Sequence, residues 1–112
     1  ALNNTGSYFT GPTIAKGSTG TWFASGSVTL HNTGAAANMN VKLWDGTTVI
    51  ASAQVVTPFA NYSVVVSLSG YIATPAGNIR ISVNDATSTA GVILYNQSGN
   101  GKDSTITAIR IA

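Results

Sequence analysis

The residues that could carry acid–base, nucleophilic or metal chemistry are few in this chain. It holds one histidine, no cysteine and three carboxylates, all of them aspartates. His31 has no second histidine or cysteine with which to share a metal ion, and it falls on the polar face of a predicted strand. We therefore interpret it as a surface histidine.

The three aspartates each sit in a local context that explains them. Asp45 lies in a turn, Asp85 at a strand end and Asp103 in the loop before the last strand. Glycoside hydrolysis usually needs two carboxylates that flank the scissile bond. Because the turn, the strand end and the loop already explain the three aspartates, we do not expect them to form such a pair. A calcium site formed by Asp85 or Asp103 together with Asn100 is a second hypothesis for the use of these carboxylates. It has little support, because the alternating acidic ligands of an EF-hand are absent. We expect no metal and no cofactor.

Two further catalytic patterns fail on inspection. No Gly-x-Ser-x-Gly motif is present to hold a serine nucleophile. The stretch GNGKDST, residues 99–105, resembles a phosphate-binding loop, but Asp103 follows Lys102 where Ser or Thr is required, and no helix is predicted after it. We interpret this stretch as a hairpin loop and expect no enzymatic activity.

The charge content is very low. Charged residues make up 7% of the chain, against about 25% in an average soluble domain. Ser, Thr, Asn and Gly together supply 49 of the 112 residues. The five cations are scattered, which does not indicate nucleic-acid binding. Hydroxyls and amides cost less to desolvate than ions, so this surface favours burial in an oligomer or contact with a sugar.

Neither a targeting signal nor a membrane span is expected. The N-terminal stretch ALNNTGSYF has no basic region and no apolar core of the kind found in signal peptides. No apolar run approaches the roughly 20 residues that cross a bilayer as a helix. We expect no membrane insertion.

Period-two alternation between Gly, Pro and Asn residues predicts an all-β fold. Eight strands are expected, from segments at 7–10, 21–32, 39–43, 49–55, 62–68, 79–83, 91–96 and 106–111. They predict an antiparallel two-sheet β-sandwich, most simply an eight-stranded jelly roll, with an immunoglobulin-like sandwich as the alternative. No linker, charge block or repeat divides the chain, so we assign one domain over residues 1–112.

The stretch VKLWDGTTVIAS predicts a hairpin. A two-residue loop of Asp-Gly would put the apolar sets of its two strands on opposite faces. A three-residue loop over 44–46, with Gly46 left-handed, instead pairs Val41 with Val49 and keeps both sets inward. This loop places Trp44 in the turn.

Exposed aromatic residues are the best remaining functional signal. Trp44, with Tyr71 and Tyr8 in loops, would stack on a sugar ring while Asp45 and its polar neighbours hydrogen-bond the sugar hydroxyls. We therefore expect glycan contacts at Trp44, Asp45 and Tyr71. The alternative is that Trp44 folds back and caps the end of the sandwich.

The order of motifs YFTGPTI, GTWFASGSVTL, VKLWDGTTVIAS, VSLSGYIATPAGNIRISVND and GNGKDSTITAIRI resembles small β domains of bacteriophage and prophage structural proteins. Such domains include tail-fibre tips, head-spike tips and capsid decorations, and the layout is also similar to trimeric jelly rolls of the C1q and tumour-necrosis-factor type. The resemblance implies a non-enzymatic homotrimer at the virion surface. Its implied partners are its own copies, other virion proteins such as the major capsid or fibre protein, and a cell-surface polysaccharide.

A second apolar set is expected to face neighbouring subunits. Phe23, Ile50, Ile93 and Tyr95 point opposite to the core residues beside them, and exposed apolar patches usually mark association. The alternative is that they meet the other sheet or a covering loop. A different class of protein, a carbohydrate-binding module of a secreted glycoside hydrolase, would share the sandwich but would be monomeric.

Overall fold

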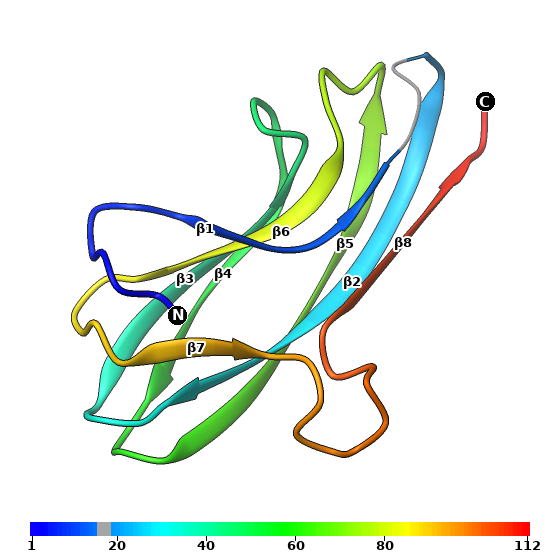
Figure 1. The fold of residues 1–112 in the computed structure, drawn as a ribbon. Coiled ribbons are helices and arrows are strands. Elements are labelled where there is room, and N and C mark those ends of the chain that lie inside the picture. The colour runs from blue at the N-terminus through cyan, green and yellow to red at the C-terminus, as the bar shows by residue number, and fades with distance from the viewer. Residues whose placement is uncertain (16–18) are drawn as a thin grey trace.

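The computed structural model describes residues 1–15 and 19–112, and their regular structure is entirely β (Figure 1). The strands are β1 (Phe9–Ile14), β2 (Thr21–Asn32), β3 (Ala37–Trp44), β4 (Val49–Thr57), β5 (Tyr62–Ala73), β6 (Ile79–Asp85), β7 (Gly91–Leu94) and β8 (Thr105–Arg110). The prediction of an all-β fold is confirmed. No stretch of the described chain is a helix able to cross a membrane.

Two antiparallel sheets form the predicted sandwich. Sheet I has the order β1-β6-β3-β4, and sheet II consists of β5, β2, β7 and β8. The pairs β1 with β6, β2 with β5 and β3 with β4 are nested, as in one long hairpin folded over on itself. This nesting is the wrapping of a jelly roll. The nested set consists of the six strands β1 to β6. Strands β7 and β8 lie outside it, because both pair with β2.

The core fills the space between the two sheets. Alternate residues of each strand point inward, as the pleat requires, and the inward residues of β2, β3 and β6 are almost completely buried. The most deeply buried apolar side chains are Leu2, Ala24, Val28, Leu30, Met39, Val41, Leu43, Ile79, Ile81 and Val83. Each large one contributes about 1.5–3 kcal/mol to folding. The same alternation leaves a second set of side chains on each outer face.

The hairpin between β3 and β4 has a different register from the predicted one. Val41 pairs with Ala53, four residues further along β4 than the predicted partner Val49. An even shift leaves every side chain on its face, so the β3 residues remain inward as predicted. Val49 itself is 49% exposed, because a bulge at Ile50 turns the start of β4 outward. The predicted three-residue loop was therefore wrong.

Asp45 explains the longer loop. Its Oδ1 accepts hydrogen bonds from the N–H groups of Thr47 (2.9 Å) and Thr48 (2.6 Å), and its Oδ2 accepts one from Ala76 (2.7 Å) in the β5–β6 connection. These hydrogen bonds reverse the chain direction at residues 45–48, as in an Asx turn. Trp44 consequently ends strand β3 and does not stand in the turn.

Gly46 and the Asp45 carboxyl both suit this loop. Gly46 has a φ of 95°, the left-handed conformation that was predicted and that glycine adopts without strain. Burial opposes ionisation of Asp45, but hydrogen bonds from the backbone of Thr48, Ala76 and Thr47 outweigh it and lower the pKa of this carboxyl. The ionised aspartate thus ties two loops together at one end of the sandwich.

Strands β7 and β8 form one interrupted edge strand. β7 pairs with residues 29–32 of β2 and β8 pairs with residues 22–27, both antiparallel, so they run in the same direction. The connection 95–104 leaves the sheet between them (orange in Figure 1). At its base, Ser104 Oγ donates to Leu94 O (2.7 Å) and accepts from Thr29 N (3.1 Å). The connection is an Ω-loop and not the predicted hairpin loop.

Candidate functional site

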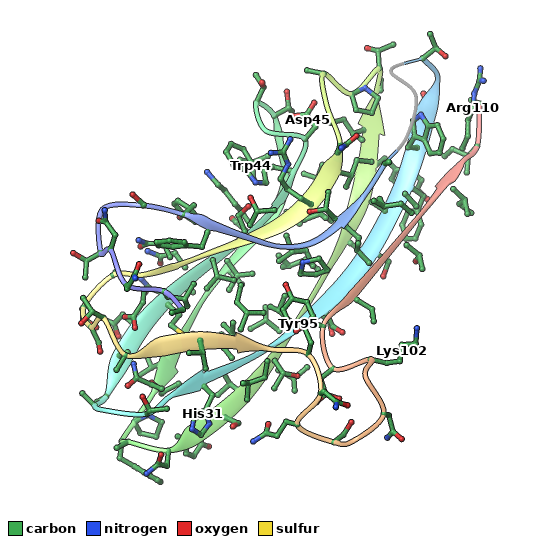
Figure 2. All side chains as sticks on the ribbon, viewed as in Figure 1. His31, Trp44, Asp45, Tyr95, Lys102 and Arg110 are labelled. Carbon is green, nitrogen blue, oxygen red and sulfur yellow. The ribbon has the colours of Figure 1, made fainter. Side chains whose placement is uncertain are left out.

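The structure does not bring the three predicted glycan contacts together. Trp44 points outward from sheet I, whereas Tyr71 is 66% exposed on the outer face of sheet II, on the opposite side of the sandwich. Asp45 is buried, and its carboxylate accepts three backbone N–H groups. Figure 2 shows Trp44 and Asp45 at the same end of the molecule. A sugar bound at Trp44 would therefore contact residues other than Asp45 and Tyr71.

Lys42 joins Trp44 to a second ring on the outer face of sheet I. Its Nζ lies 3.5 Å from the ring centroid of Trp44 and 4.0 Å from that of Tyr8. Both distances are within the range of cation–π attraction. Trp44 is held in place by a hydrogen bond of 2.9 Å from its Nε1 to Ser82 Oγ. The ammonium group thus sits between two aromatic faces.

A row of three amide side chains crosses the same face beside the rings. Gln54 on β4, Asn40 on β3 and Asn84 on β6 are register partners. Gln54 Nε2 donates to Asn40 Oδ1 (2.9 Å), and Asn40 Nδ2 donates to Asn84 Oδ1 (3.3 Å). We call this surface, made of Tyr8, Asn40, Lys42, Trp44, Gln54 and Asn84, the amide face.

The segment before β1 completes the amide face. Asn84 Nδ2 donates to the backbone oxygens of Thr5 and Ser7, both at 2.9 Å. These bonds hold the segment against sheet I and so place the ring of Tyr8 where it meets Lys42. Tyr8 lies just before β1, which begins at Phe9 and not at residue 7 as the predicted strand did, and it is 42% exposed.

The outer face of sheet II has a different composition. Cross-strand rows run over β5, β2 and β8, and their outward residues are Tyr71, Phe23 and Ile109, then Ser69, Ser25 and Thr107, then Ser67, Ser27 and Thr105. We call this surface the hydroxyl face. The rings of Phe23 and Tyr71 are 5.1 Å apart and tilted. None of the nine side chains carries a charge.

Two of the four predicted interface residues reach the surface. Phe23 lies in the apolar row of the hydroxyl face, and Tyr95 at the end of β7 is 45% exposed. Ile93 and Ile50 pack against the core instead, so the expectation that they point away from it was wrong. Ile93 pairs with Leu30 and shares its inward side, and Ile50 is the bulge residue at the start of β4.

Asp85, Asp103 and His31 each have a hydrogen-bond partner in their own part of the fold. Asp85 is fully buried and accepts a hydrogen bond from Asn32 Nδ2 (3.2 Å). The hydroxyl and backbone N–H of Ser98 donate to Asp103 and lower its pKa. His31 Nδ1 lies 2.6 Å from a serine hydroxyl of β5. Over residues 1–15 and 19–112, no three His, Asp or Glu side chains gather closely enough to hold a metal ion.

Several residues of the amide face were missed in the sequence analysis. The alternation in β3 already places Asn40 and Lys42 on the Trp44 side of the strand, and this signal was overlooked. Gln54 and Asn84 join them only because β3 pairs with both β4 and β6. The register between strands so far apart in the chain carries no local sequence signal.

Neither face contains a pocket in the described part of the chain. A search with protein-family models found no match for the chain, and no curated protein matches it either. The function must therefore be argued from the chemistry of the amide face and of the hydroxyl face.

Proposed function

We propose that this domain is a non-enzymatic structural module that acts by self-association, as a homotrimeric capsid decoration, head-fibre or fibre-tip domain at the surface of a phage virion. The hydroxyl face carries this proposal. It offers three strands of neutral side chains, with one apolar row formed by Tyr71, Phe23 and Ile109. Tyr71 and Ile109 are 66% and 61% exposed, and such a row usually marks an association surface.

The hydroxyl face offers a contact of modest size. Strands β5 and β2 have 12 residues each and β8 has 6, so at about 3.3 Å per residue and about 4.8 Å between strands they cover about 475 Å² per copy. Three such faces together would bury about 1,400 Å² around the axis of a trimer, beside the roughly 1,200–2,000 Å² of a stable two-chain interface. Desolvating serine and threonine hydroxyls costs much less than desolvating ions. Three copies that meet with these faces toward a common axis would form a closed ring.

The use of the carboxylates supports a role without catalysis. Asp45, Asp85 and Asp103 each accept backbone N–H groups of their own loops or of neighbouring ones. A general acid or base needs its carboxyl within reach of a substrate. These three carboxylates stabilise loops by accepting backbone hydrogen bonds, which fits a domain that acts through its surfaces.

Sedimentation equilibrium at micromolar concentration tests the proposal. We expect a mass three times the 11.4 kDa of the chain. Replacing Tyr71 and Ile109 with threonine keeps β-forming residues on the strands but removes the two most exposed residues of the apolar row, and we expect it to shift the protein toward monomer. Val56→Thr is the control, because Val56 is also more than half exposed (54%), on β4 of sheet I.

Two results would count against self-association through the hydroxyl face. One is a wild-type protein that stays monomeric at micromolar concentration. The other is a control variant Val56→Thr that dissociates as readily as the double threonine variant. A trimer that resists both substitutions would place the contact elsewhere, with Tyr95 and the β7 edge as the next surface to examine.

A second candidate function, carbohydrate binding, is favoured by the amide face. Rings that stack on a sugar beside amides that hydrogen-bond its hydroxyls are the usual components of such a site. This activity fits attachment of a virion to a surface polysaccharide and also fits a carbohydrate-binding module of a secreted glycoside hydrolase. The mass measurement separates the two settings, since the module is expected to be monomeric.

A further inference from the structure

We infer that the amide face binds an acidic polysaccharide and that Lys42 is the cation that recognises the carboxylate or sulfate groups of its ligand. The inference rests on the second candidate function, carbohydrate binding, and names the class of polysaccharide. It departs from the site predicted by sequence, because Lys42, and not Asp45 or Tyr71, lies against the Trp44 ring. The ammonium of Lys42 also lies over the ring of Tyr8, which the prediction had included.

The positive charge of Lys42 faces rings instead of a carboxylate. Its Nζ lies between the faces of Trp44 and Tyr8. The aspartate carboxylates are held elsewhere, by backbone N–H groups of the loops at residues 45–48, 86–90 and 95–104. A ring quadrupole attracts a cation without neutralising it. The rings therefore leave the ammonium without a neutralising partner, so that it can attract an anionic ligand.

The two rings also preorganise the ammonium group. A lysine side chain normally loses much rotamer freedom when it is immobilised. Here Trp44 is already fixed by its hydrogen bond to Ser82, and Tyr8 by the bonds from Asn84 to the preceding segment. Less ordering remains to be done when a ligand arrives, which favours affinity.

A second cation lies on the same face one strand away. Arg80 pairs with Trp44 across β6 and β3, and its Cζ is 5.9 Å from the Trp44 ring centroid. The backbone oxygens of Asp45 (3.2 Å) and Asn78 (3.1 Å) accept hydrogen bonds from its guanidinium. Two of the four cations in the described part of the chain thus share the face with the amide row.

The shape and chemistry of the face favour a polysaccharide over other anions. Without a pocket among the described residues, a small ligand would be covered poorly, whereas a polymer can lie along the strands. The amides of Gln54, which is exposed, and of Asn40, which is half-buried, carry both donors and acceptors, as sugar hydroxyls do, whereas Asn84 is buried and supports the row from beneath. Nucleic acid binds by neutralising several phosphates, for which two cations are too few.

Titration calorimetry of the whole chain tests the inference with matched polymers. Polygalacturonate is compared with its fully methyl-esterified form, and dextran sulfate with dextran. We expect at least one acidic polymer to bind roughly tenfold or more tightly than its neutral counterpart, and the pair that shows the difference identifies carboxylate or sulfate. Raising the salt concentration should reduce the difference, because exposed charges are screened.

Substitutions assign the effect to Lys42. We expect Lys42→Met to reduce affinity for the acidic polymer by roughly tenfold and to leave affinity for the neutral polymer unchanged. Lys42→Arg, which keeps a cation on the rings, should retain most of the binding. Lys102→Met is the matched control, because Lys102 lies on the 95–104 loop, apart from Trp44 (Figure 2). A cooperative melt confirms that each variant is folded.

Each contrary result has a distinct meaning. Equal binding of acidic and neutral polymers would overturn the inference and leave carbohydrate binding in place. Binding of neither polymer would overturn both. An equal loss from Lys102→Met and Lys42→Met would reduce the effect to unspecific attraction by net charge, and tighter binding of an oligothymidylate would replace the polysaccharide with nucleic acid. Any of these results excludes the proposed role of Lys42.

Discussion

The two outer faces of the sandwich show two ways of exposing a β-sheet to water. On the amide face, long polar side chains bond to one another across strands, and the rings of Tyr8 and Trp44 hold a cation. On the hydroxyl face, rows of serine and threonine leave the sheet flat and neutral.

This difference suggests a division of roles between the faces. Short hydroxyl side chains lose little conformational entropy when a second surface covers them, which suits contact with another copy. On the amide face, the hydrogen-bonded amides and the Lys42 ammonium between two rings present polar groups in fixed positions. This arrangement suits recognition of a polysaccharide. The following predictions test whether the two roles are separate.

The largest effect is expected from placing a charge on the hydroxyl face. Ser67 is exposed in the third cross-strand row of this face, opposite Ser27. Ser67→Glu would bury an unpaired carboxylate between copies, and we expect it to weaken association by about 3–5 kcal/mol. Sedimentation equilibrium measures the change, and binding of acidic polysaccharide should remain as in the wild type.

The same charge on the amide face is the reciprocal control. Ser52 is exposed on β4 and pairs directly with Lys42. Ser52→Glu should offset the charge of Lys42 and lower affinity for acidic polysaccharide, while the mass in solution stays unchanged. If each glutamate disturbed both properties, the two faces would not act separately.

A loss of global stability is expected from Asp45→Ala. The substitution leaves three backbone N–H groups without their acceptor, and we expect unfolding to become easier by about 2–3 kcal/mol. Chemical denaturation measures this change. Asp103→Ala, in the exposed 95–104 loop, is the comparison and should cost less. Association should persist in both variants at temperatures where they are folded.

Acid should weaken the fold through the same two carboxyls. The folded-state pKa values of Asp45 and Asp103 lie below the ordinary value of 3.8. Their stabilisation is therefore complete above that value and is lost as the pH falls through the lower folded-state values. We expect the melting temperature to drop below about pH 4. Asp45→Asn should flatten this dependence, and an unchanged slope would contradict the assignment.

The smallest effect is expected within the amide row. Gln54→Ala removes one exposed hydrogen bond, to Asn40 Oδ1, so the stability should fall by about 0.5–1 kcal/mol or less. Affinity for polysaccharide should fall a few-fold, since the row loses donors. Ser69→Ala on the hydroxyl face is the control and should leave the affinity unchanged. Equal effects from both variants would indicate that the amide row has no special part in binding.

The sequence predicted best what the alternation of a single strand decides. The inward residues of β3 were assigned correctly, because each side of a strand has a period of two. The run 91–96 is apolar almost throughout, so alternation did not distinguish the faces of Ile93. The β3–β4 register depended on three hydrogen bonds to Asp45, one of them from the distant residue Ala76.

The meeting of Tyr8 with Lys42 shows a second limit. It requires β1 to pair with β6, and β6 in turn with β3. These pairings join segments far apart in the chain, and the local pattern of polar and apolar residues does not specify them. The sequence therefore indicated Trp44 as part of a site, but it did not indicate which residues of other strands surround Trp44.

The closed base of the 95–104 connection makes this segment suitable for display of foreign peptides. Ser104 bonds both to Leu94 and to Thr29, so the strands on either side are aligned independently of what the loop contains. The entropy of closing a longer loop grows only slowly with its length. A peptide inserted after Gly99 would be carried outward from the edge of sheet II, once on each copy, and an oligomer would present it in several copies at fixed spacing.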